Sequence, residues 1–303
     1  MDVLRQSIIK SYLWCPTSFK YRYIDKIPST FRSLAAVHGT VLHRLIEEFH
    51  TVNWSLDIAE RYRELMDDEE HHSDESDVPI YWKEDREPTI DKLVDEVVEM
   101  LENYRGKDYN RDANVILSES KFMLKVGRNV FSGTVDQIRQ NDNGEFTLLD
   151  FKSSKFPPNQ TFLDVDYQFG LYSLACWKGV FKLPDGTMKM LEIPPDKLRI
   201  VYYHLRDHIP YKRNGKGFQA GDERGDPRKF TSRTRDQLKV LKRDVGAIAS
   251  NINRGVFPRN PGTINCPACA YSAICIGDSR IDGLSAHQIK SIETLNLPME
   301  EAA

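Results

Sequence analysis

Four cysteines near the two ends of the chain constrain its fold more than any other feature. Cys15 stands alone near the N-terminus, and Cys266, Cys269 and Cys275 follow about 250 residues later as C-x2-C-x5-C. Four thiolates are the ligand set of a structural zinc ion or of an iron–sulfur cluster. If all four share one site, the metal joins the two ends and makes the intervening chain one closed unit. Taken alone, the cysteines leave zinc, a redox pair and a cluster open.

Composition predicts an intracellular chain with an ordinary core. Its 303 residues, 40% hydrophobic and 29% charged, suffice for one large domain or two small ones. The net charge of −3 gives no global basic field, although a local groove would be enough for nucleic acid. No apolar run reaches the length of a membrane span and no cleavable leader is visible, so we expect a cytoplasmic protein without membrane contact. Cys176, which lies in an apolar stretch, is interpreted as a buried core thiol.

Hydrophobic periodicity predicts an α/β fold in which helices precede and follow a meander of three strands. Helical spacing is found in residues 6–24, 34–66, 89–104, 164–181 and 236–252, and strand-like runs in residues 115–126, 130–139, 145–152 and 198–205. Pro16 should bend or restart the first helix after Cys15. The ten acidic residues between Asp67 and Glu87 predict a solvated loop.

Two carboxylates and a lysine form a candidate catalytic group on the predicted strands. Asp136 lies on the second strand of the meander, and Asp150 and Lys152 lie two apart on the third. Because side chains two apart on a strand share a face, Asp150 and Lys152 point the same way and Phe151 points to the opposite, buried face. If the strands pair as a hairpin, Asp136 comes close to Asp150 and the oxygens suit Mg²⁺ or Mn²⁺, with Lys152 orienting or helping to deprotonate a water. A surface salt bridge on a hairpin would explain the same residues.

Two further patterns on predicted helices accompany this group. His43 follows Gly39 by one helical turn, and Gly39 would let that helix approach another backbone closely. His43 could then bind a metal or a phosphate, or be an ordinary polar residue. Gln168 and Tyr172 lie one turn apart on the helix that follows the third strand, where a polar pair beside the core is the plainer interpretation.

A basic segment over residues 206–235 is a candidate path for nucleic acid. It holds nine lysines and arginines against four acids, with aromatic residues interleaved. Cations there would meet phosphates and rings would stack on bases, without sequence preference. The candidate DNA-binding residues are Lys212, Arg213, Lys216, Arg228 and Lys229. A solvated basic loop is the alternative.

Taken in order, these residues resemble the RecB-like branch of the PD-(D/E)xK nucleases, from about Ser11 to Cys275. More narrowly, they are similar to its iron–sulfur members, the CRISPR-associated adaptation exonucleases and the nuclease domains of AddB-type helicase–nucleases. The resemblance implies a restriction-endonuclease-like core sheet flanked by helices, with a helical N-terminal cover and a C-terminal iron–sulfur segment. The expected parts are residues 1–110, which carry the first cysteine and the histidine, residues 111–255 as nuclease core, and residues 256–303 as cluster-binding segment and tail, all forming one unit.

The resemblance also implies roles for individual residues. The implied catalytic residues are His43, Asp136, Asp150 and Lys152, the first three as ligands of Mg²⁺ or Mn²⁺, with Gln168 and Tyr172 supporting them or positioning DNA. The four cysteines Cys15, Cys266, Cys269 and Cys275 would hold a structural [4Fe–4S] cluster, with zinc as the alternative. Glu119 lies on the first strand, where members often carry an acid. Two departures are Asp150, where many members have Glu, and the acidic stretch, which has no clear counterpart.

The activity implied is a divalent-metal-dependent DNA exonuclease that hydrolyses phosphodiester bonds at DNA ends in repair, recombination or CRISPR adaptation. We expect a preference for single strands and 5′→3′ polarity. Two alternatives stay open: a DNA-end-binding or processing subunit that is active only with a partner, and a non-catalytic, zinc-stapled DNA-binding protein. Expected partners are DNA and proteins of CRISPR adaptation or recombination, and the sequence leaves a homo-oligomer open.

Overall fold

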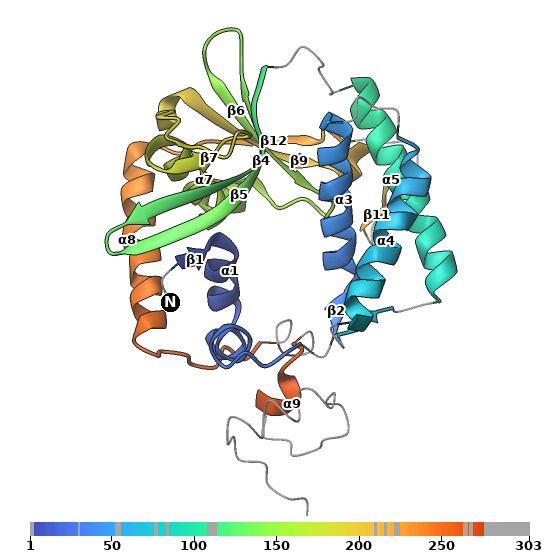
Figure 1. The fold of residues 1–303 in the computed structure, drawn as a ribbon, viewed down its shortest axis with the longest axis horizontal. Coiled ribbons are helices and arrows are strands. Elements are labelled where there is room, and N and C mark those ends of the chain that lie inside the picture. The colour runs from blue at the N-terminus through green and yellow to red at the C-terminus, as the bar shows by residue number, and fades with distance from the viewer. Residues whose placement is uncertain are drawn as a thin grey trace, which may run out of the picture.

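One large sheet organises the molecule (Figure 1). The computed structural model describes residues 3–29, 31–51, 56–75, 78–82, 85–107, 114–208, 211–214, 217–220, 225–262, 266 and 269–275. The sheet has the strand order β12-β9-β6-β5-β4-β7-β8, with β1 paired to β5 off this path. Its strands are β1 Val3–Arg5, β4 Asn114–Val126, β5 Asn129–Gln140, β6 Phe146–Lys152, β7 Val180–Lys182, β8 Met188–Lys189, β9 Leu198–His204 and β12 Arg228–Thr231.

Helices cover both faces of this sheet. They are α1 Gln6–Trp14, α2 Pro16–Phe19, α3 Leu34–Thr51, α4 Ile58–Glu75, α5 Arg86–Lys107, α6 Gln160–Val165, α7 Tyr167–Lys178, α8 Arg235–Asn253 and α9 Ser272–Cys275. In Figure 1, α3, α4 and α5 lie together on one side of the molecule, and α1 and α8 lie on the other. The smaller elements are a π-helix over Lys20–Ile24, 3-10 turns over Pro195–Lys197 and Leu205–His208, and the strand pairs β2 Arg32–Ser33 with β3 Ile80–Tyr81 and β10 Tyr211–Asn214 with β11 Gly217–Ala220.

The central strands β4, β5 and β6 form an antiparallel meander, as the sequence predicts. The β4–β5 turn contains Gly127 with a φ of 61°, a left-handed conformation that glycine adopts without strain. β6 instead pairs in parallel with β9, and parallel neighbours need a crossover connection. Helices α6 and α7 provide that crossover, and so α7 lies beside β6, where the candidate catalytic residues are.

Two hydrophobic cores lie on the two faces of the sheet. The first core joins α1, α7 and α8 to residues such as Leu148 of β6, and the second joins α3, α4 and α5 to Leu149 and Phe151. Consecutive side chains of a strand point to opposite faces, which is why β6 serves both cores. Asp150 lies on the same strand and is fully buried.

Local sequence signals explain several helix boundaries. The side chain of Asp166 accepts hydrogen bonds from the backbone amides of Gln168 and Phe169 and so caps the start of α7. Thr234 and Gln237 form a reciprocal capping box at the start of α8. Cys15 has an extended backbone between α1 and α2, and Pro16 takes the first position of α2, as the sequence predicts.

The α/β class with helices flanking a central, mostly antiparallel sheet is confirmed, but one predicted loop is wrong. Residues 67–75 continue α4 as a helix rather than forming a solvated loop. Arginines from other segments neutralise this acidic run: Arg32 pairs with Glu69, and Arg86 pairs with Asp67 and with Glu70, the latter at 2.7 Å. The strands β1, β7, β8 and β12, with two to four residues each, were not predicted.

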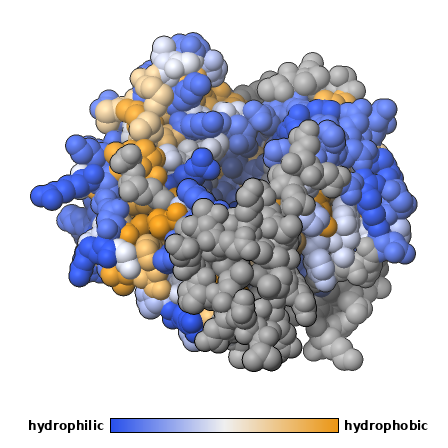
Figure 2. All heavy atoms as spheres, turned by 60° about the horizontal axis from the view of Figure 1, so that its bottom comes forward, coloured by the Kyte–Doolittle hydropathy of each residue, from blue (hydrophilic) through white to orange (hydrophobic). Residues whose placement is uncertain are grey.

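The surface differs between the two sides of the molecule. In Figure 2, hydrophilic side chains dominate the side that holds α4 and α5, and hydrophobic ones gather on the side that holds α8 and the β4–β5 hairpin. Within the described ranges, none of the helices combines the length and the apolar character that crossing a membrane requires.

Candidate active site

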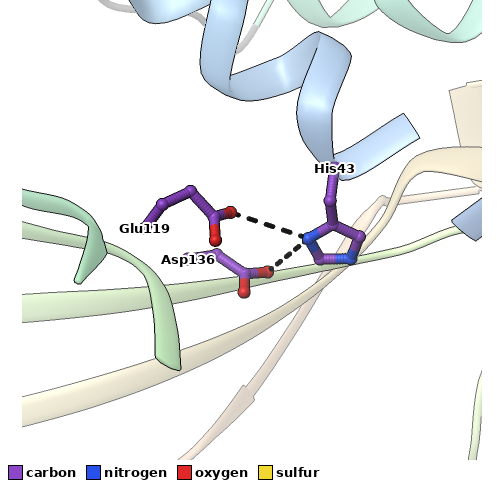
Figure 3. A group of neighbouring side chains, drawn as sticks. All are labelled: His43, Glu119 and Asp136. Carbon is purple, nitrogen blue, oxygen red and sulfur yellow. Dashed lines mark ion pairs between the residues drawn. The ribbon is translucent and has the colours of Figure 1, made fainter. Parts of the chain in front are cut away.

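A histidine and two carboxylates from three elements meet above the sheet (Figure 3). His43 reaches down from α3, and its Nδ1 lies 3.4 Å from Asp136 Oδ2 and 3.8 Å from Glu119 Oε1. Each residue offers one ligand atom, and these three atoms lie within 4.8 Å of one another. Asp136 is fixed from below because its Oδ2 accepts a 2.7 Å hydrogen bond from the backbone amide of Phe151.

The lysine and second aspartate of β6 adjoin this group. Lys152 Nζ lies 2.7 Å from Asp150 Oδ2, and Phe151 points away into the second core, as strand periodicity predicts. Strands β5 and β6 pair as a hairpin, with Gln137 opposite Leu149, so Asp136 and Asp150 are the next residues in register. The carboxylate of Asp150 faces Lys152 and Gln168 and is not among the three clustered ligand atoms.

Mutual repulsion and burial set the electrostatics of the group. Burial raises the pKa of Asp136 to about 7, and the charge of Asp150 adds to this rise. Burial alone would lower the pKa of His43, but the carboxylates of Glu119 and Asp136 outweigh it and the pKa rises. For Lys152, too, burial lowers the pKa while Asp150 and Asp136 raise it, and the net pKa is raised, so Lys152 is an ammonium at neutral pH.

Glu119 owes its place to a strained backbone. It lies between the cross-strand pairs Ser118–Gln137 and Ser120–Val135, which puts it opposite Asp136 on the neighbouring strand. Its φ of 42° is left-handed, a conformation that non-glycine residues rarely adopt and that clusters at functional sites. The resemblance implies only that an acid is common on this strand, and the identity of a residue does not reveal such a backbone conformation.

Gly39, by contrast, does not have the role expected from the sequence. A Cβ added at Gly39 would meet no atom of the described structure within 4 Å, so α3 makes no close backbone approach there. The expectation of such an approach is therefore wrong. His43 reaches the carboxylates through the position of α3 itself, which the second core packs against β6 and β9.

Gln168 and Tyr172 connect the carboxylate of Asp150 to the sheet. Gln168 Nε2 donates to Asp150 Oδ1 at 3.1 Å and to the hydroxyl of Tyr172 at 2.7 Å, and that hydroxyl donates to the carbonyl oxygen of Thr134 at 2.8 Å. The pair thus contacts the group directly and is more than a polar pair beside the core. Two side chains of α1, Gln6 and Lys10, contact the same pair and were not predicted.

The donor set fits a divalent cation. Carboxylate oxygens suit Mg²⁺ and Mn²⁺, and an imidazole nitrogen is an accepted additional ligand for transition metals. Burial, and after it the charge of Asp150, raises the pKa of Asp136, and a bound cation would favour the ionised carboxylate instead. The residues positioned to hold it are His43, Glu119 and Asp136, with Asp150 adjoining.

The four cysteines lie around one cavity of about 50 Å³. The other residues lining it are Trp14, Ser18, Tyr21, Asn260, Tyr271 and Ser272. Cys269 Sγ accepts a 3.4 Å hydrogen bond from the backbone amide of Tyr271. Burial raises the pKa of the Cys275 thiol, and the charges of the other three cysteines add to this rise. Cys176 is far from solvent in the first core, as predicted.

Further contacts join the same two segments of the chain. Tyr12 and Thr17 donate to the carbonyl oxygens of Val256 and Phe257 at 2.7 and 2.9 Å, and the ring of Phe19 stacks on Phe257 with centroids 5.9 Å apart. Asn260 Nδ2 donates to the carbonyl of Trp14 at 2.9 Å. The two ends are therefore held together by ordinary packing as well as by any group that the cysteines bind.

The candidate DNA-binding residues are placed in part. Arg228 and Lys229 lie on β12, where Arg228 Nε is 3.2 Å from Asp226 and Lys229 Nζ is 3.5 Å from Asp207. Lys212 and Arg213 lie on β10, of which only the backbone is described, and Lys216 lies outside the described residues.

Comparison with known proteins identifies the family. A solved structure, "Crystal structure of SSO0001", is 15% identical, with 81% of this chain and 96% of that chain covered and a TM-score of 0.31. No curated protein matches the chain. Residues 4–276 match the PD-(D/E)XK nuclease superfamily, whose members use divalent metals such as Mg²⁺. Since this match spans the carboxylate group and all four cysteines, the chain belongs to the PD-(D/E)XK nuclease superfamily.

Proposed function

We propose that the protein is a divalent-metal-dependent deoxyribonuclease that acts as an exonuclease on DNA ends, with single strands preferred and a 5′→3′ direction. The observation that carries the proposal is the group of His43, Glu119 and Asp136 beside the Asp150–Lys152 pair. Membership of the superfamily supports nuclease chemistry. The order of the sequence motifs, which resembles that of iron–sulfur exonucleases, is the ground for proposing action at DNA ends.

The residues divide the work as follows. A bound divalent cation would polarise the scissile phosphate and lower the pKa of the attacking water. His43, Asp136 and Asp150, with Glu119 as an additional acid, would hold that cation. Lys152 is charged at neutral pH, which suits it to orienting the water or stabilising phosphate charge rather than to accepting a proton. Gln168 keeps the Asp150 carboxylate in place through its amide.

The position of β12 supports an approach of DNA along the sheet edge. Lys229 is opposite Tyr202 on β9, and Tyr202 is opposite Asp150 on β6, so the three form one transverse row. Neighbouring strands are about 4.8 Å apart, which places Lys229 about 10 Å from Asp150 by backbone spacing. A phosphate bound by Lys229 would then belong to a nucleotide close to the cleaved bond, whereas Arg228, on the opposite face of β12, would contact DNA further along the path. Lys212, Arg213 and Lys216 would extend this path.

Cleavage of labelled single strands tests the activity. With Mn²⁺ or Mg²⁺, the wild-type protein should release nucleotides, and Asp150→Ala and Lys152→Ala should lose at least about 100-fold in rate. Asp142→Ala, in the exposed turn between β5 and β6, and Lys125→Ala, at an exposed position of β4, are matched controls and should cut normally. Equal cleavage by wild type and the two site variants would refute the site. A protein that is idle alone but cuts with an added partner would favour the processing-subunit alternative.

Blocked ends test the direction of digestion. A 5′→3′ exonuclease should spare an oligonucleotide blocked at its 5′ end, degrade one blocked at its 3′ end, and leave circular single strands intact. Cutting of the circle would show endonuclease action, and the reverse blocking pattern would show 3′→5′ digestion.

We further propose that Cys15, Cys266, Cys269 and Cys275 bind a structural [4Fe–4S] cluster, with zinc as the alternative occupant. Supporting this, four cysteines from both chain ends line one cavity, and an amide donates to Cys269 Sγ, a contact of the kind that tunes iron–sulfur sites. Such a group would reinforce the closure of the chain and take no part in hydrolysis.

Elemental analysis of anaerobically purified protein tests the cofactor. A cluster requires iron and acid-labile sulfide in equal amounts with a brown visible chromophore, lost in Cys15→Ser and kept in the control Cys176→Ser. A colourless protein with stoichiometric zinc would overturn the cluster and leave the nuclease proposal intact.

A further inference from the structure

Two side chains of α1 meet two side chains of α7 in a matched pattern. Gln6 contacts Tyr172, with Nε2 2.9 Å from the hydroxyl, and Lys10 contacts Gln168, with Nζ 2.9 Å from Oε1. Both pairs are spaced four residues apart, which puts their members on one face of each helix. Since the earlier residue of α1 meets the later residue of α7, the two helices run antiparallel at this contact.

From this contact we propose that Lys10 is a positioning residue for the catalytic carboxylate of Asp150, acting through the amide of Gln168. The inference rests on the proposed nuclease function for its catalytic consequence. The resemblance and the sequence pattern assign no role to Lys10, which is half-exposed and lies 158 residues from Gln168 in the chain.

The chemistry of an amide explains how Lys10 would act. The carboxamide of Gln168 has one oxygen, which accepts, and one nitrogen, which donates twice. An ammonium can only donate, so Lys10 binds the oxygen and leaves both N–H groups for Asp150 Oδ1 and the Tyr172 hydroxyl. Asp150 Oδ2 then stays free of the amide and faces Lys152. Without Lys10 the amide oxygen has lost its partner, and the group is free to turn away from Asp150.

A second contact, to a buried aspartate, holds the ammonium of Lys10 in place. Its Nζ lies 3.2 Å from Oδ2 of Asp166, a buried residue whose Oδ1 caps α7. Asp166 therefore caps the start of α7 and also holds the ammonium of Lys10. Gln168, which Lys10 contacts, is the second residue of the same helix. The ion pair is exposed only on its lysine side, but Asp166 keeps its hydrogen bonds from the amides of Gln168 and Phe169 without Lys10. Lys10 should therefore affect geometry more than folding.

The variant Lys10→Met tests the proposal with two independent measurements. Because outer residues that orient a metal site typically affect affinity or activity by 10–100-fold, we expect kcat on single-stranded DNA to fall at least about tenfold. The KM for DNA and the Tm should stay unchanged, and Lys10→Arg should recover part of the rate. Lys239→Met, which removes an exposed lysine paired with Asp236 on α8, should behave as wild type.

Binding of Mn²⁺, followed by electron paramagnetic resonance without DNA, gives the second readout. Lys10→Met should weaken Mn²⁺ binding about tenfold, as a smaller effect in the same direction as Asp150→Asn. If the wild type binds Mn²⁺ but cuts nothing, the proposed function fails, yet weaker binding by Lys10→Met still supports the positioning role. Unchanged Mn²⁺ binding and kcat would overturn it. A raised KM with unchanged kcat would overturn it as well, because Lys10 would then contact DNA directly. A lowered Tm with normal activity per folded molecule would reduce Lys10 to a structural anchor.

Discussion

At the scale of single residues, Asp136 shows a conflict between folding and function. Its carboxyl is buried, and burial together with the charge of Asp150 raises its pKa from 3.8 to about 7. The folded protein thus holds this proton more tightly than the unfolded chain does. Ionisation opposes folding, and the free energy of unfolding falls as the pH rises from about 4 to about 7. Ionisable groups whose pKa is strongly shifted in this way, at a cost in folding stability, are typical of functional sites.

Asp136→Asn should therefore stabilise the metal-free protein. Asparagine can still accept the hydrogen bond from Phe151, and it removes the buried charge, so we expect a gain on the order of 2 kcal/mol at pH 8. Urea unfolding in the presence of EDTA measures the change. Asp142→Asn, at an exposed turn, is the matched control and should have no effect. Destabilisation by Asp136→Asn would contradict the repulsion inferred here.

The same carboxyl predicts how cation binding depends on pH. A cation must displace the proton that Asp136 holds below about pH 7, so binding should release a proton and strengthen as the pH rises through that value. The increase in Tm produced by Mg²⁺ or Mn²⁺ should be larger at pH 8 than at pH 5.5. Asp136→Asn should show little increase at either pH. An increase that is equal at both pH values would rule out Asp136 as the titrating ligand.

At the scale of elements, the docking of α1 on β5 depends on one small residue. A Cβ at Gly133 of β5 would lie 2.7 Å from the ring of Phe122 and 2.7 Å from Oε1 of Gln6. Phe122 is a buried aromatic ring of the first core and has little room to move. Glycine is therefore required for α1 to lie against the sheet at this place.

Gly133→Ala should destabilise the protein by about 1–3 kcal/mol, because the core must shift to accommodate a methyl group. Gly39→Ala is an informative counterpart: its Cβ meets nothing, and it lies within α3, so it should stabilise by about 0.5–1 kcal/mol. Thermal unfolding of both variants checks the pair. Equal effects of the two substitutions on Tm would contradict the lack of space inferred at Gly133.

Elements also show how far the sequence could predict the site. Asp150 and Lys152 were predictable because the two-residue period of a strand fixes their face, and the hairpin brought Asp136 to them. The position of Glu119 was not predictable, because a left-handed backbone conformation at this residue directs its side chain and no residue pattern encodes such a conformation. Lys10 was not, because its role arises from an antiparallel contact between helices far apart in the chain. The C-terminal half of α4 was missed because its acids are paired by Arg32 and Arg86 from other segments.

At the scale of the whole molecule, two hydrophobic cores share one sheet. The region of the second core contains two histidines whose protonation at low pH should destabilise the fold. Burial and the nearby charge of Arg206 lower the pKa of His38 to about 4. His38 Nδ1 contacts the Tyr62 hydroxyl at 2.8 Å. Burial and the charge of Arg139 lower the pKa of His50, which lies on the same helix α3, to about 4. Both imidazoles must be neutral for α3, α4 and α5 to pack as they do.

His38→Asn should therefore reduce the sensitivity to acid. Unfolded histidine takes up a proton near pH 6.5 and the folded one only near pH 4, so the stability that His38 contributes is complete above pH 6.5 and is lost as the pH falls towards 4. This loss amounts to about 3 kcal/mol for such a shift. Urea unfolding at pH 7.5 and pH 4.5 should show a smaller drop for the variant than for the wild type or for the exposed-site control His72→Asn. An identical drop in all three would contradict a neutral, buried His38.

The contacts between the chain ends have a consequence for how the protein is made. Tyr12 of α1 binds the carbonyl oxygen of Val256, and Thr17 of α2 binds that of Phe257. The ribosome adds these partners 244 and 240 residues after Tyr12 and Thr17. A chain that ends before Val256 would already contain Asp136, Asp150 and Lys152, and Lys10 could already meet Gln168 and Asp166. It would lack the two hydrogen bonds that Tyr12 and Thr17 make to the later segment. The docking of α1 and α2 is therefore complete only once residues 256 and 257 have been synthesised, so the last stabilising contacts of the helix that carries Lys10 form late in synthesis.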